Sequence, residues 1–226
     1  MTTTRATGRP HDDAVLVRRL ADRGRYDAAT VDAIIDEALV CNVAFALPDG
    51  RPTVIPTIHA RDGDRLLLHG STGSRLAQWT RTRPVPVAVS VTLVDGIVFA
   101  RSGFHHSMNY RSVVVMGEAT AVTEPAARAA ALDRIVDHVA PGRAAALRAP
   151  TPRELAATEV MELSLAHASA KVRTGGVNDE PEDLDLAVWA GVLPLRIVAG
   201  DPQPDSALPP GTALPDHVRE HPLAQD

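Results

Sequence analysis

The feature that most restricts the fold is the run of residues 40–70, in which short apolar stretches alternate with turn sequences. Two joints divide it, residues 48–50 (PDG) and residues 61–64 (RDGD). Gly, Asp and Pro between apolar stretches are typical of hairpin turns, because Gly adopts the positive φ that tight turns need. Residues 40–70 therefore predict three short strands in an antiparallel meander.

Later segments add strands and few helices. Residues 85–102 are a long β-branched stretch that we expect to bend near Asp95-Gly96, and residues 109–122 and 160–173 are each expected to be one strand. Helices are expected in four segments: residues 27–39, 76–83, 124–140 and 151–159. Because the strands do not alternate with helices, we expect a closed or nearly closed β-barrel with peripheral helices and no doubly wound sheet.

The composition excludes several classes of protein. The 226 residues carry a formal net charge of −5, so no basic face is expected to bind nucleic acid. The single cysteine, Cys41, excludes an internal disulfide and a cysteine-based metal site, and its apolar neighbours predict a buried thiol. No apolar stretch approaches the roughly 20 residues that span a bilayer, and no secretory signal is evident. A cytoplasmic protein without membrane contact is therefore expected.

The ends of the chain differ from its middle. Residues 1–12 are polar and are expected to be a disordered lead-in to a single domain, residues 13–200. Residues 201–226 are rich in Pro and are expected to be an extended tail. Aromatic residues make up only 3% of the chain, so the core is expected to consist of Val, Leu, Ile and Ala.

One turn concentrates the chemistry. Residues 66–79 read LLLHGSTGSRLAQW, an apolar strand ending at His69, then a turn rich in Gly, Ser and Thr, then a helix start. The glycines allow backbone N–H groups to converge, Ser71 and Ser74 add hydroxyl groups, and Arg75 adds a guanidinium suited to a phosphate. The turn favours an anion site, and a plain strand-to-helix connection capped by Ser74 is the alternative.

A second polar feature is the pair Arg111-Ser112 inside an otherwise apolar strand. Neighbouring strand residues point to opposite faces, so one of the pair is expected to line a phosphate, a flavin edge or a subunit interface. A solvated Arg111 at a barrel rim is the alternative. His105 and His106 lack the spacing of metal ligands, so we expect no metal site and place them on a loop or facing a substrate.

Four stretches together resemble a known family. TVIPTIH, LLLHGSTGSR, NYRSVVVMGEA and the terminal WAGVLPL are similar, in order and spacing, to the FMN-binding split barrels of the pyridoxamine 5′-phosphate oxidase superfamily. The branch with the nitroimidazole-resistance and flavin-nucleotide-binding proteins is the nearest, and the similarity covers residues 14–200. It implies a mainly β fold, a six-stranded antiparallel split β-barrel of Greek-key type with peripheral α-helices. It also implies a homodimer with FMN in the interface and a small-molecule substrate.

The resemblance also assigns residues to FMN. The phosphate-binding turn corresponds to Ser71, Ser74 and Arg75, and the branch's histidine before that turn corresponds to His69. The strand that backs the isoalloxazine ring corresponds to Val54, Ile55, Pro56 and Thr57. A position beside the flavin on a later strand corresponds to Ser112, next to Arg111. A tryptophan that reaches the flavin across the dimer corresponds to Trp189.

Departures from the family pattern leave the activity open. The true oxidases end in an arginine-rich segment that grips pyridoxamine phosphate, and the end of this chain has none, so that activity is not expected. The leading expectation is an FMN-dependent oxidoreductase, with the redox chemistry supplied by the flavin. The alternatives are a flavin-binding or storage protein without turnover, a haem-binding barrel with His69, His105 or His106 as axial ligand, and a barrel that binds deazaflavin F420.

Overall fold

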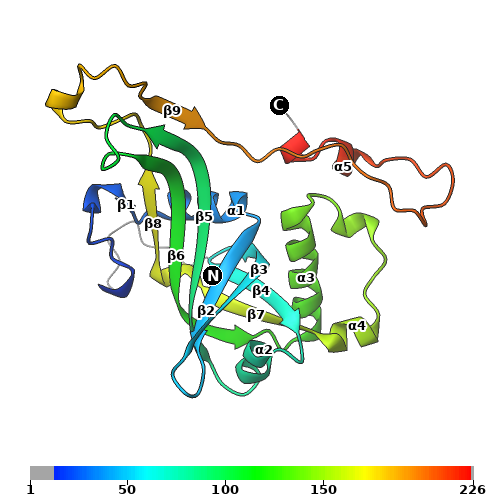
Figure 1. Ribbon diagram of the computed structural model, residues 1–226. Coiled ribbons are helices and arrows are strands. Elements are labelled where there is room, and N and C mark those ends of the chain that lie inside the picture. Colours follow the sequence, from blue (N-terminus) through cyan, green and yellow to red (C-terminus); the bar gives the residue numbers. More distant parts are fainter. Residues whose placement is uncertain (1–12, 225–226) are drawn as a thin grey trace.

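A computed structural model describes residues 13–224 of the chain (Figure 1). In that range nine strands form one sheet: β1 (Gly24–Arg25), β2 (Val40–Ala46), β3 (Pro52–Asp62), β4 (Arg65–Ser71), β5 (Val85–Phe99), β6 (Ser107–Ala121), β7 (Thr158–Ser164), β8 (Ala168–Arg173) and β9 (Gly191–Pro194). The α-helices are α1 (Ala28–Glu37), α2 (Arg75–Thr80), α3 (Pro125–Val139), α4 (Pro152–Ala157) and α5 (Asp216–Arg219). Short 3-10 turns cover Asp13–Val15, Ala21–Arg23, Ala144–Ala146, Leu165–His167, Pro181–Asp183 and Pro222–Ala224.

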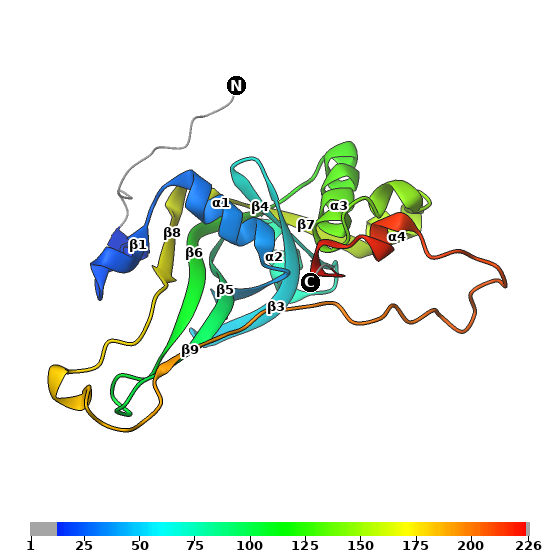
Figure 2. The ribbon, with the colours of Figure 1, turned by 90° about the horizontal axis from the view of Figure 1, so that it is seen from above.

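Six of the strands close into a barrel. The order around the ring is β6-β7-β4-β3-β2-β5, and β5 pairs again with β6. The end of β6, Thr120 and Ala121, pairs with β7, whereas residues 110–115 of the same strand pair with β8. The barrel is therefore split between β7 and β8, with helices around it (Figure 2). The predicted split β-barrel is confirmed.

The predicted turns connect β2 to β3 and β3 to β4. Gly50 and Gly63 have φ values of 83° and 61°, the left-handed region that favours glycine. The predicted bend of β5 is a register shift against β6 between Val94 and Gly96. The local sequence therefore predicts both hairpin turns and the bend of β5 correctly.

One predicted strand is wrong. Residues 160–173 do not form a single strand, because β7 ends at Ser164, a 3-10 turn follows, and β8 begins at Ala168. The physical reason is a change of neighbour: β7 pairs with β4, whereas β8 pairs with β6. The side chain of Ser164 accepts a hydrogen bond from the N–H of Ala166 at 3.2 Å, which holds the turn between them.

The core lies inside the barrel and is built from aliphatic side chains. Alternate valines of β5 and β6 point inward, and Val31, Ile34 and Ile35 of α1 pack against them. Asp27 begins α1 by accepting a hydrogen bond from the N–H of Thr30 at 2.8 Å. A smaller cluster joins α3 to the outside of β3, β4 and β7. Figure 1 shows α3 beside the barrel.

Cys41 lies in the barrel core. Its side chain is buried, and burial raises the pKa of the thiol to about 12. The predicted buried thiol is confirmed, and a thiol with so high a pKa is a poor nucleophile.

Two loops project together beyond one end of the barrel. The loop 100–106 follows β5, and the segment 174–190 leads into β9, which pairs with the end of β5. We call these two loops the tip, and both views show them side by side (Figures 1 and 2). The chain then returns past α3, where Nε2 of His221 donates to the carbonyl of Val139 at 2.9 Å. Among the described residues, no helix is both long and apolar enough to cross a bilayer.

Candidate functional site

A cavity of about 270 Å³ opens between β3, β4, β7 and α2. Most of its wall is apolar, and none of the described residues that line it is charged. The lining residues are Val43, Ile55, Pro56, Thr57, Leu68, His69, Gly70, Ser74, Leu76 and Met161. Five of the residues that the resemblance assigned to FMN are thus brought together here: Ile55, Pro56, Thr57, His69 and Ser74.

The β3 side of the cavity combines apolar side chains with main-chain polar groups that have no strand partner on one edge. Residues 52–58 pair with β2, and only residues 59–62 pair with β4. Within the described chain, the other edge of residues 52–58 has no strand partner, so main-chain polar groups on that edge are open to a ligand. Val54 does not line the cavity; it lies beside Ile55 with 60% of its surface exposed.

His69 enters the cavity from β4, opposite Val160 of β7. Its Nδ1 atom is buried and has no hydrogen-bond partner among residues 13–224. Burial lowers the pKa of His69 below the ordinary histidine value, because the imidazolium form loses its hydration. The imidazole of His69 therefore forms part of the cavity wall in its neutral form, with Nδ1 buried and unpaired within the described chain.

The turn 71–75 is held by its own hydrogen bonds. Ser71 Oγ accepts from the N–H of Gly73 at 3.2 Å, and Ser74 Oγ caps α2 by accepting from the N–H of Ala77 at 3.4 Å. Neither glycine of the turn, Gly70 or Gly73, has a positive φ. Ser71 does not line the cavity. The turn is thus a capped strand-to-helix connection.

Arg75 begins α2 and is exposed. It does not line the cavity. The pKa of Asp49 on the β2–β3 hairpin is lowered mainly by hydrogen bonds from Arg51, and the charge of Arg75 makes a smaller contribution in the same direction.

Arg111 and Ser112 lie away from this cavity and point to opposite sides of β6. Arg111 is held between two carboxylates: it donates to Glu37 at 2.7 Å and to Asp95 at 2.7 and 3.0 Å. These hydrogen bonds, that of Glu37 first, raise the pKa of Arg111. Ser112 Oγ donates to the carbonyl of Lys171 at 3.2 Å. The polar surroundings of Arg111 are thus carboxylates of its own chain.

Trp189 lies at the tip and is 70% exposed. Its ring packs edge-on against Phe99 at 5.8 Å between centroids. A Cβ on Gly191 would lie 2.9 Å from two ring atoms, so glycine at this position allows the ring to fold back over the strand. The structure does not bring Trp189 into the cavity of the same chain.

The apolar residues that line the cavity could not be predicted from the sequence. Leu68, Leu76 and Met161 are buried residues of strands and a helix, and their alternation is the same as that of core residues. Nothing in their spacing separates a residue that lines a cavity from one that packs against another core residue. Only the divergence of β3 from β4 creates the space.

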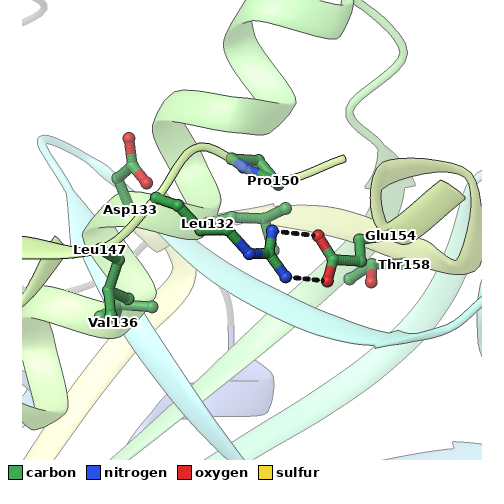
Figure 3. A pocket seen from close by; sticks show the side chains of 8 residues that line it. Leu132, Asp133, Val136, Leu147, Pro150, Glu154 and Thr158 are labelled. Atoms are coloured by element: carbon green, nitrogen blue, oxygen red, sulfur yellow. Dashed lines mark hydrogen bonds and ion pairs between the residues drawn. The ribbon is translucent and has the colours of Figure 1, made fainter. Parts of the chain in front are cut away.

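A second cavity, of about 350 Å³, lies between α3 and α4 (Figure 3). Arg148 crosses it and donates to both carboxylate oxygens of Glu154, at 2.6 and 2.8 Å. This pair satisfies its own charges, so the cavity offers a ligand mainly the apolar side chains around Leu132 and Leu147. In the part of the chain that the structure describes, no cluster of three or more His, Cys, Asp or Glu residues could hold a metal ion.

Comparison with known proteins gives a consistent picture. Residues 27–172 match the sequence profile of a family described as pyridoxamine 5′-phosphate oxidase. The structure is similar to that of the flavocytochrome Anf3 from Azotobacter vinelandii, with 36% identity over 94% of this chain and 98% of that chain, and a TM-score of 0.87. The FAD- and haem-binding protein from Mycobacterium smegmatis is 37% identical over 88% of this chain and 96% of its own, with a TM-score of 0.83.

A more distant structure shares the fold alone. A 5-nitroimidazole antibiotic resistance protein from Bacteroides thetaiotaomicron is 19% identical over 66% of this chain and 86% of its own, with a TM-score of 0.55. No protein of curated function matches the sequence.

Proposed function

This chain belongs to the pyridoxamine 5′-phosphate oxidase family, and on that premise we propose that it is a flavocytochrome, which binds a flavin and a haem and passes electrons between them. Two proteins that match it along nearly their whole lengths support the proposal, since one is a flavocytochrome and the other binds FAD and haem. The observation in this chain that carries it is the uncharged, apolar-walled cavity with the imidazole of His69, whose buried Nδ1 is unpaired, in its wall.

The cavity fits the ring of a flavin. An isoalloxazine ring has two apolar faces and a polar edge, so it needs an apolar surface beside hydrogen-bonding groups. Ile55 and Pro56 would cover one face, the open edge of β3 would meet the polar rim, and His69 would hydrogen-bond the ring. Bound flavin takes up a hydride or single electrons, and haem passes electrons singly. The residues of the cavity bind and orient the ring and keep water from one of its faces.

FAD suits the site better than the FMN expected from the sequence. FMN ends in a phosphate monoester with a charge close to −2, which needs nearby cations. The described lining of the cavity supplies none, and Arg75 is outside it. The two phosphates of FAD are joined as a pyrophosphate with about one charge on each, and they can extend past the cavity mouth into water. The FAD-binding relative favours the same choice.

We also propose that two copies form the working unit. Val54 and Ile55 at the cavity mouth are 60% and 38% exposed. Exposed apolar side chains of this size mark interaction surfaces, and a second copy would bury them. Light scattering on the eluting protein would then give twice the chain mass of 24.0 kDa.

The test is the identity of the bound cofactors. Purified protein is denatured, and the released small molecules are separated and identified by mass, alongside an absorption spectrum of the native protein. FAD together with haem b supports the proposal. Release of FMN alone returns the protein to the FMN oxidoreductase expected from sequence, and release of neither, with no uptake of either on reconstitution, contradicts a flavocytochrome.

A further inference from the structure

The tip carries an unusual concentration of exposed apolar side chains. The sequence has three Phe and two Trp residues, and three of these five, Phe99, Phe104 and Trp189, lie at or beside the tip. Phe104 is 90% exposed, Trp189 is 70% exposed, and Met108 on the adjoining strand is 44% exposed. A surface of this kind on one end of a protein is suited to a flat apolar ligand.

His106 lies among these rings with a defined tautomer. Its ring is 6.0 Å from that of Phe99, which in turn contacts Trp189. Nδ1 of His106 is 2.9 Å from the carbonyl of Ser102, so Nδ1 carries the proton and donates it. Nε2 then carries the lone pair, and no hydrogen bond to it is found within residues 13–224. Histidines that bind metals usually donate their other N–H to a backbone carbonyl in this way.

Six other described histidines are less suited to bind iron through Nε2. In four of them Nε2 itself is engaged by a carbonyl group or by a guanidinium: His59, His138, His217 and His221. His105, next to His106, faces Glu180, with Nε2 3.4 Å from its carboxylate. His69 lines the cavity proposed for the flavin, which has room for one ring system.

The loops that hold His106 are fixed by buried polar contacts. Asp179, with a side chain only 1% exposed, accepts from the backbone N–H of Arg101 at 3.0 Å and from its guanidinium at 2.8 Å. Asn109 donates to the carbonyl of Gly175 at 3.0 Å. The contacts of Asp179 join the loop 100–106 to the segment 174–190, and Asn109 joins β6 to the same segment, so the imidazole and the rings beside it are held in place before a ligand binds.

We infer that the tip is the haem site, where Nε2 of His106 would ligate the haem iron and Phe99 and Trp189 would lie beside the porphyrin. This assignment rests on the proposed flavocytochrome function. It places the two cofactors on different parts of the chain, the flavin in the cavity beside β3 and the haem at the tip. A haem needs only one or two protein ligands to its iron, which agrees with the lack of a multi-ligand metal cluster in the described chain.

The assignment is tested by titrating haemin into the purified full-length protein and recording its Soret band, while flavin content is measured on the same samples. The variants are His106→Ala, His105→Ala as the matched control on the same loop, and His69→Ala. We expect His106→Ala to weaken haemin binding at least about tenfold and to change the Soret band, with the spectrum restored by added imidazole. Its flavin content should stay as in the unchanged protein. His105→Ala should keep both properties, and His69→Ala should lose flavin and keep haemin.

Other outcomes overturn the assignment. His106→Ala with an unchanged Soret band and affinity would do so, as would loss of haemin in His69→Ala or His105→Ala alone. Loss of both cofactors in His106→Ala would point to a general structural role of the loop. If the unchanged protein takes up flavin but no haemin, the proposed flavocytochrome function itself fails, and the assignment fails with it.

Discussion

Filling the cavity from Gly70 should remove flavin binding without unfolding the protein. Gly70 lines the cavity, and its φ is not positive. A Cβ built on it would meet only Ser74 Oγ at 3.5 Å and the Met161 methyl at 4.0 Å, which are ordinary contacts. A larger side chain therefore has room to enter the cavity, and Gly70→Leu tests what that space is for.

The size of the effect follows from the volume lost. Each added carbon atom occupies about the space of a water molecule, roughly 30 Å³, so leucine fills roughly 120 Å³. The whole cavity measures about 270 Å³. If the flavin ring loses about 100 Å² of apolar contact, the loss at about 25 cal/mol per Å² is about 2.5 kcal/mol, or roughly 70-fold in Kd. Folding should not suffer, because replacing glycine inside a strand gains about 0.5 to 1 kcal/mol.

The assay is fluorescence quenching of FAD on titration with protein, together with thermal denaturation of the flavin-free chain. The matched control is Gly73→Leu, since Gly73 lies on the same turn, has no positive φ and does not line the cavity. Its flavin affinity should remain unchanged. If Gly70→Leu folds and binds FAD as tightly as the unchanged protein, the flavin does not occupy this cavity.

Three further predictions concern other residues. Arg111→Met should lower the free energy of unfolding by about 1 kcal/mol, because Glu37 and Asp95 lose their shared cation. The flavin affinity of this variant should be unchanged. A large loss of flavin in a folded variant would show that Arg111 binds the cofactor. Burial lowers the pKa of His59 from 6.5 to about 4, so the unfolded chain binds a proton first as pH falls, and about 3 kcal/mol of stability should be lost between these values. Urea denaturation of His59→Gln, whose amide can still donate to the carbonyl of Ile35, should show a smaller loss over that range, and an equal loss would assign the pH dependence to other groups. Asp179→Ala should make the segment 174–190 more sensitive to limited proteolysis, because Arg101 loses both of its contacts there, while the barrel resists cleavage; unchanged cleavage would contradict the anchoring role of Asp179.

Local chemistry in the sequence was sufficient for much of the fold. Gly50 and Gly63 fix the two hairpins through their positive φ, and Asp27 begins α1, all within a few residues of chain. The division of residues 160–173 into β7 and β8 was missed, because it arises from a change of neighbouring strand that no local pattern records. The apolar pattern simply continues through Leu165, which is buried in the turn.

In the candidate site, too, local features could be predicted from the sequence and long-range contacts could not. The alternation of side-chain direction along a strand correctly predicts that Arg111 and Ser112 point to opposite faces. Glu37, the partner of Arg111, lies 74 residues away in the sequence and could not be identified from the strand itself. The cavity joins residues of four strands and a helix, and its apolar members have the same pattern in the sequence as core residues. The sequence offered His106 only as one of three candidate haem ligands, beside His69 and His105, because the features that favour it are the carbonyl of Ser102 and a ring contact with Phe99.

The most direct test of the central claim is the absorption spectrum of the purified protein, taken with chemical identification of what it releases. A flavocytochrome should show flavin bands and a Soret band together and release FAD and haem in similar amounts. Flavin bands without a Soret band, unchanged after incubation with haemin, would leave a flavin-binding split barrel and contradict the proposed flavocytochrome function.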